Sequence, residues 1–188
     1  MRKKIKYQFF IISIVFSCSM DSYYSLEKSE LDSGIRNDSL FLGIKFGMTS
    51  SEFYSHCWDL NKRKLVTQGP SNNSVRYLIP TQSIGQNIEM LFYPVFNRDT
   101  VYEVNSTYSY TAWAPWNDGT DSEYLIKEVK DILSDWYDAD FIPVKNPKSD
   151  DFLYVTVDGN RRITITEVSD REVRARFTDL LIEKKIKK

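Results

Sequence analysis

The chain has 188 residues, with 25 Lys or Arg against 26 Asp or Glu and a formal net charge of −1. This length suits one domain or two small repeated units. A charge so close to balance argues against a nucleic-acid-binding protein, because such proteins usually carry a basic surface.

The N-terminus predicts a bacterial lipoprotein signal peptide over residues 1–17. Four basic residues lie between positions 2 and 6, and an apolar run follows from Phe9 to Phe16. The run is shorter than the roughly 20 apolar residues that a membrane-spanning helix needs, and it has the size and flanks of a signal-peptide core. It ends in VFSC, Val15 to Cys18, which resembles the bacterial lipobox, whose Cys is acylated and becomes the mature N-terminus. The alternative is an ordinary signal peptide with an unmodified Cys nearby.

Lipidation of Cys18, with palmitate or similar chains, predicts a stable membrane anchor. Two or more acyl chains bind a protein stably to a membrane, whereas a single chain gives only marginal binding. Ser19, and not Asp, follows the Cys. By resemblance to bacterial sorting rules, this favours the outer membrane over the inner membrane. Removal of residues 1–17 changes the formal net charge from −1 to −5, so no nucleic-acid partner is expected. Cys57 is then left without an intrachain partner, and we expect a buried apolar role for it.

Residues 18–40 are polar and Ser-rich, without a sustained period, and predict a flexible tether. The folded part is expected to begin at Phe41. It divides into two units, residues 41–112 and residues 113–182, followed by a charged tail at residues 183–188.

The first unit begins with a helix signal. Thr49 and Glu52 form the T-x-x-E pattern of a capping box. Phe53, Cys57 and Leu60 then recur at helical spacing, which predicts a helix to about residue 64. Three strand-like runs follow at residues 75–80, 87–96 and 100–110.

The second unit echoes the first at a distance of 71 residues, because Thr120 and Glu123 repeat the capping pattern. An apolar stripe then predicts a helix to Trp136. Strand-like runs follow at residues 152–157, 161–168 and 173–177, with an Asp-Gly hairpin signal after the first. The predicted fold is therefore α+β, with two helices packed on a largely antiparallel sheet of about six strands, arranged as a tandem repeat of a helix-plus-three-strand unit.

The stretch GIKFGMTSSEF, Gly43 to Phe53, resembles the helix start of the small outer-membrane lipoproteins of the barrel-assembly machinery. The tandem spacing is similar to that of the beta-lactamase-inhibitor-protein fold, and the overall pattern resembles small uncharacterised lipoproteins of Bacteroidetes-type bacteria. The resemblance covers residues 43–110 best. It implies a fold and brings no catalytic residue with it.

Catalytic and metal-binding patterns are weak. His56 is the only histidine, and its neighbour Cys57 does not share a helix face with it, because residues at i and i+1 point in different directions. One His and one Cys cannot supply a zinc site, and no glycine-rich phosphate loop is present. The sequence therefore predicts no catalytic residue, no metal site and no cofactor.

Aromatic residues gather near the middle of the chain. Tyr108, Tyr110, Trp113 and Trp116 crowd one strand end and the loop after it. If these side chains are exposed together, they form a candidate binding site, since Trp and Tyr dominate recognition hot spots. The alternative is that they cover the core between the two units.

The predicted function is a non-enzymatic binding or scaffold module of the bacterial cell envelope. Its predicted partners are the membrane, through the lipid on Cys18, and another envelope protein or a glycan. Two alternatives stay open at this point: a small envelope hydrolase that uses carboxylates, and a purely structural envelope protein.

Overall fold

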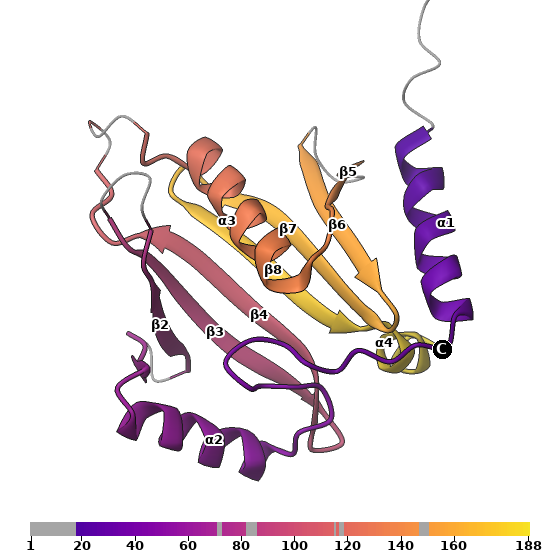
Figure 1. Ribbon diagram of the computed structural model, residues 1–188, viewed down its shortest axis with the longest axis horizontal. Helices are drawn as coiled ribbons and strands as arrows, with labels where there is room; N and C mark the ends of the chain where they lie inside the picture. Colours follow the sequence, from indigo (N-terminus) through magenta and orange to yellow (C-terminus); the bar gives the residue numbers. More distant parts are fainter. Residues whose placement is uncertain (1–17, 71–72, 82–85, 115, 117–118, 147–150) are drawn as a thin grey trace, which may run out of the picture.

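The structure, a computed structural model, describes residues 18–70, 73–81, 86–114, 116, 119–146 and 151–188. Within these residues the chain forms four helices and one eight-stranded antiparallel sheet (Figure 1). The helices are α1 (Cys18–Asp32), α2 (Ser50–Lys62), α3 (Ser122–Tyr137) and α4 (Leu180–Ile186). The strands are β1 (Val66–Gln68), β2 (Val75–Ile79), β3 (Ile88–Asn97), β4 (Thr100–Tyr110), β5 (Ile142–Lys145), β6 (Phe152–Asp158), β7 (Arg161–Ser169) and β8 (Glu172–Asp179).

The strand order is β1-β2-β3-β4-β8-β7-β6-β5, with every neighbouring pair antiparallel. Strands β1 to β4 form one meander and β5 to β8 form another. The two meanders meet through their last strands, where Val104 of β4 pairs with Phe177 of β8. The sheet is therefore continuous across the two halves of the chain, and its free edges are β1 and β5.

The predicted count of elements was wrong, although the α+β class is right. The sheet has eight strands where about six were expected, and the described residues form four helices where two were expected. Each unit is consequently one helix followed by four strands. The missed strands are short: β1 has three residues, and β5 carries Pro143. Proline lacks a backbone N–H and is confined to sheet edges, which is where β5 lies.

The capping pattern correctly predicts the start of α2. The Thr49 side chain accepts a hydrogen bond from the Glu52 backbone N–H, and the Glu52 carboxylate accepts one from the Thr49 backbone N–H at 2.8 Å. These bonds satisfy two of the N–H groups that a helix leaves free at its first turn. The capping pattern predicted at Thr120 and Glu123 was wrong, because the cap of α3 is the next residue, Asp121, whose carboxylate accepts a hydrogen bond from the Tyr124 N–H at 3.1 Å.

The main core lies between the sheet and the layer formed by α2, α3 and the segment before α2. This segment crosses the sheet between the two helices (Figure 1). It buries Phe41, whose ring contacts Phe92 of β3 at 5.0 Å, Phe177 of β8 at 5.2 Å and Trp136 of α3 at 6.4 Å between centroids. Phe41 thus joins both halves of the sheet to α3.

Helix α1 occupies the place of the expected flexible tether. It packs on β5 and β6, on the face opposite α3. Successive side chains of β7 point to opposite faces of the sheet. Ile163 and Ile165 belong to the core with α3, whereas Arg162 and Thr164 line a hollow with Tyr23 of α1, so α1 lies on the other face.

Buried charges attach α1 to the sheet. The Arg162 guanidinium donates to both carboxylate oxygens of Glu183 in α4 at 3.0 Å and to the Tyr23 hydroxyl at 3.1 Å. Glu27 of α1 accepts a hydrogen bond from Tyr23 and lies 2.8 Å from Lys184 of α4. Part of the predicted charged tail, residues 183–186, is therefore helical and bonded.

Among the described residues, no helix combines the length and apolar character that crossing a membrane requires. The predicted signal peptide, residues 1–17, lies outside the described residues. Cys18, the predicted lipidation residue, is the first residue of α1.

We expect Phe41→Ala to lower the free energy of unfolding by about 3–5 kcal/mol, because it leaves a cavity beside the buried rings of Phe92 and Phe177. Urea denaturation followed by circular dichroism measures this change. The matched control is Phe152→Ala. The Phe152 side chain is exposed, so its removal should lower the free energy of unfolding by less than about 1 kcal/mol. Equal losses in the two variants would contradict the central position of Phe41.

We expect Arg162→Ala to lower the free energy of unfolding by about 2 kcal/mol or more, since it removes two charge-assisted hydrogen bonds to the buried Glu183 carboxylate and the bond to Tyr23. Among the described residues, it leaves Glu183 with Lys187 alone. The same denaturation experiment applies. Lys28→Ala, an exposed position on α1, serves as the control. A loss below about 1 kcal/mol for Arg162→Ala would show that the charge cluster does not hold α1 in place.

Candidate functional site

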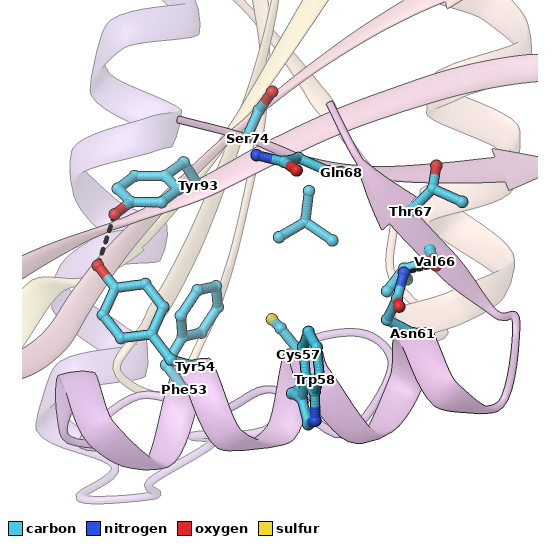
Figure 2. Close-up of a pocket in the computed structure, with 11 residues that line it drawn as sticks. Phe53, Tyr54, Cys57, Trp58, Asn61, Val66, Thr67, Gln68, Ser74 and Tyr93 are labelled. Atoms are coloured by element: carbon cyan, nitrogen blue, oxygen red, sulfur yellow. Dashed lines mark hydrogen bonds between the residues drawn. The ribbon is translucent and has the colours of Figure 1, made fainter. Parts of the chain in front are cut away.

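An open groove lies between α2 and the outer strands β1 to β3 (Figure 2). Its volume is about 370 Å³. The lining residues come from α2, from β1, from β2 and the residue before it, and from β3; they are Phe53, Tyr54, Cys57, Trp58, Asn61, Val66, Thr67, Gln68, Ser74, Val75 and Tyr93. The volume and the apolar lining are in the range of small-molecule sites.

The groove exists because α2 carries two apolar stripes. Phe53 and Leu60 face the sheet and are buried. Tyr54 and Trp58, four residues apart, lie along a second stripe, where side chains at i and i+4 are neighbours. Trp58 is 64% exposed and Tyr54 is 50% exposed, so this second stripe borders the groove and is not packed into the core.

One end of the groove is closed by a pair of tyrosines. The Tyr54 hydroxyl of α2 and the Tyr93 hydroxyl of β3 share a hydrogen bond of 2.6 Å (Figure 2). This hydrogen bond, together with burial, raises the pKa of Tyr93 to about 12. The Tyr93 phenol therefore stays neutral at physiological pH, and the two rings present aromatic surface whose hydroxyls are hydrogen-bonded to each other.

The other end is closed by the turn that follows α2. The Asn61 side-chain amide donates to the Val66 carbonyl at 3.0 Å, which holds the end of α2 against the start of β1 (Figure 2). The ammonium of Lys62 lies 5.9 Å from the centroid of the Trp58 ring, so a positive charge stands beside the aromatic rim.

Cys57 lies on the helix side of the groove, and its sulfur points toward the strands (Figure 2). Burial raises the pKa of the Cys57 thiol to about 11. At neutral pH the residue is therefore a protonated thiol, which is a poor nucleophile. The expected apolar role of Cys57 fits this position, although the side chain is half-buried and not fully enclosed.

His56 does not reach Cys57. Its Nε2 lies 2.7 Å from the Leu42 carbonyl oxygen, and its ring borders a separate polar hollow with Lys45, Glu52 and Asp59. The two neighbouring side chains leave α2 on different sides, as the i, i+1 argument predicts. Within the described residues, no group of three or more His, Cys, Asp or Glu side chains is placed to hold a metal ion.

The four aromatic residues predicted as a binding site are not gathered into one exposed patch. Tyr108 is fully buried, and Tyr110 is buried with its hydroxyl donating to Glu128 at 3.1 Å. The Arg171 guanidinium lies 5.7 Å from the Trp113 ring centroid, and Trp113 is half-buried. Trp116 alone is open to solvent, at 82% exposure. The two tyrosines are core residues, because alternate β4 side chains point into the sheet–helix layer.

Sequence reasoning missed the groove. The available signal was the pair Tyr54 and Trp58, which lies off the stripe of Phe53 and Leu60 and so has no place in the core of a two-layer fold. What no sequence pattern revealed is β1, the short strand that completes the far wall.

Comparison of the chain with family models, with curated proteins and with solved structures found no match. The resemblance to small outer-membrane lipoproteins therefore stays a prediction. The class that the fold and the groove define is an α+β protein with one continuous antiparallel sheet and an aromatic groove at one edge.

We expect alkylation of Cys57 by iodoacetamide to be slow at pH 8 and to rise until about pH 11, because only the thiolate reacts and the folded protein raises the thiol pKa. Peptide mass spectrometry follows Cys57 separately from Cys18. The urea-unfolded chain is the control, and its rate should rise near pH 8.5, the value of a free thiol. Coincident pH profiles for the folded and unfolded chains would contradict the burial of this thiol.

Proposed function

We propose that this chain is a non-enzymatic binding module of the bacterial cell envelope, anchored through Cys18, and that the groove beside α2 holds the ligand. The anchor is supported by the basic run, the apolar run and the VFSC pattern at the N-terminus. By the same pattern, the outer membrane is the proposed location and the membrane itself is one partner.

The observation that carries the proposal is the aromatic surface left open at the groove. Trp58 and Tyr54 expose large apolar area on one rim, and Val66 and Val75 line the opposite wall. Exposed concave apolar surface of this kind marks interaction sites on soluble domains. Aromatic side chains also lose little conformational entropy when a ligand covers them, so they suit recognition.

The hydrolase alternative receives less support from the groove. No aspartate or glutamate is among the described residues that line it, so it offers no pair of carboxylates for acid–base chemistry. Its one thiol is held protonated. A ligand in the groove would meet aromatic rings, aliphatic side chains and a few neutral polar groups, which favour binding.

We expect N-phenylnaphthylamine, a neutral apolar dye, to gain fluorescence in the presence of the wild-type protein and of Cys57→Ala, which keeps the groove open. Cys57→Leu fills the space beside Trp58 and should lower dye affinity at least tenfold, because the added side chain occupies the volume that the dye needs. A fluorescence titration measures the dissociation constants, and circular dichroism checks that each variant is folded.

Trp116→Ala is the matched control, since this residue is exposed and lies outside the groove. Its dye affinity should equal that of the wild type. If Trp116→Ala lowers dye binding and Cys57→Leu does not, the binding site is the loop after β4 and not the groove.

A further inference from the structure

The turn that ends α2 is basic and rigid. Its residues Lys62, Arg63 and Lys64 are consecutive. The Leu65 N–H donates to the Leu60 carbonyl at 3.0 Å, and the Lys64 N–H donates to the Asn61 carbonyl at 2.8 Å. This is the pair of bonds that defines a Schellman motif. The three cationic side chains are therefore carried by a backbone whose hydrogen bonds are satisfied.

Lys64 occupies a backbone position that favours glycine. Its φ is 59°, in the left-handed region, and it is the residue directly after the helix cap. Glycine is the usual residue there, because a side chain in this conformation costs roughly 1 kcal/mol or more. A lysine at this position adds a charge to the turn at a cost in stability, and such costs concentrate at functional sites.

The basic turn adjoins the groove directly. Asn61, directly before it, and Val66, two residues after it, both line the groove. An acidic neighbour neutralises only part of its charge, because Asp59 lies 3.4 Å from Lys62. Within the described part of the chain, Arg63 and Lys64 have no ion pair. Three consecutive cationic residues thus follow the groove residue Asn61, and the ammonium of Lys62 lies 5.9 Å from the ring of Trp58, which lines the groove.

We propose that the ligand is an amphiphilic carboxylate of medium chain length, with its alkyl chain in the groove and its carboxylate at the turn of Lys62, Arg63 and Lys64. This inference rests on the proposed function and adds the ligand class. The groove follows α2 from Asn61 to Tyr54, seven positions apart, which is about 10 Å at the helical rise. The paired hydroxyls of Tyr54 and Tyr93 close the far end, which limits the length of the chain.

The experiment compares decanoate with decanol, which has the same alkyl chain and no charge. Isothermal titration calorimetry on the folded chain, below the micelle concentration, measures both affinities. We expect decanoate to bind about fivefold to tenfold more tightly than decanol, because several partly exposed cations each contribute a modest attraction. We also expect this preference to shrink as salt is raised. Bound decanoate should slow alkylation of Cys57, which places the ligand in the groove.

The test variant is Arg63→Ala/Lys64→Gly, and the control is Lys28→Ala/Lys185→Ala, which removes the same charge from exposed positions on α1 and α4. The test variant should bind decanoate and decanol about equally, while the control keeps the wild-type preference. Lys64→Gly alone should raise the melting temperature, because it relieves the left-handed backbone, so weaker binding cannot be assigned to unfolding.

Three results would overturn the inference. Equal affinity of the wild type for decanoate and decanol shows that the turn does not select a carboxylate. An equal loss of preference in the control variant shows that net charge, and not this turn, attracts the anion. Dye binding in the groove without binding of either decyl compound leaves the proposed function standing and rejects this ligand class. Absence of dye binding as well would reject the groove as a site.

Discussion

The pairing of β4 with β8 makes one sheet from two meanders, and Phe41 covers this seam from the helix side. The rings of Phe92 and Phe177 approach Phe41 from the two halves of the sheet, and Trp136 approaches it from α3. Because α2 and α3 lie over different halves, the segment between α1 and α2 has to fill the space between them (Figure 1). This segment contacts α3 through Phe41 and α2 through the Leu42 carbonyl, which lies 2.7 Å from His56 Nε2.

The placement of α2 decides the groove. Its N-terminus is tied to the hairpin between β3 and β4, where the Ser50 hydroxyl donates to Asp99 at 2.5 Å and Thr49 bridges to Thr100. Its C-terminus is tied to β1 by Asn61. Between these two attachments the outer strands are too short to cover the Tyr54–Trp58 stripe, so an open apolar space remains at the sheet edge, next to the basic turn that ends α2.

Helix α1 changes how the proposed anchor would present the domain. A flexible tether would let the domain rotate freely above the membrane, whereas α1 begins at Cys18 and is attached to the sheet through Glu27, Tyr23 and Arg162. Under the proposed lipidation, the acylated residue would directly precede a docked helix. The groove lies at the β1 edge of the sheet, and α1 lies at the β5 edge (Figure 1).

The sequence by itself determined the elements whose signals are local: the capped start of α2, the hairpins of long strands and the α+β class. It placed α3 but not its cap, which is Asp121 and not Thr120. It did not determine β1, β5, α1 or the groove. Strand β1 has only three residues, too few to show an alternating pattern. Pro143 argues against a strand where β5 lies, and α1 lacks an apolar stripe that would indicate a packed helix. These parts are stabilised by distant residues, such as Arg162, which lies 139 positions after Tyr23. Only the tertiary structure could therefore decide them, because long-range pairing leaves no period in the chain.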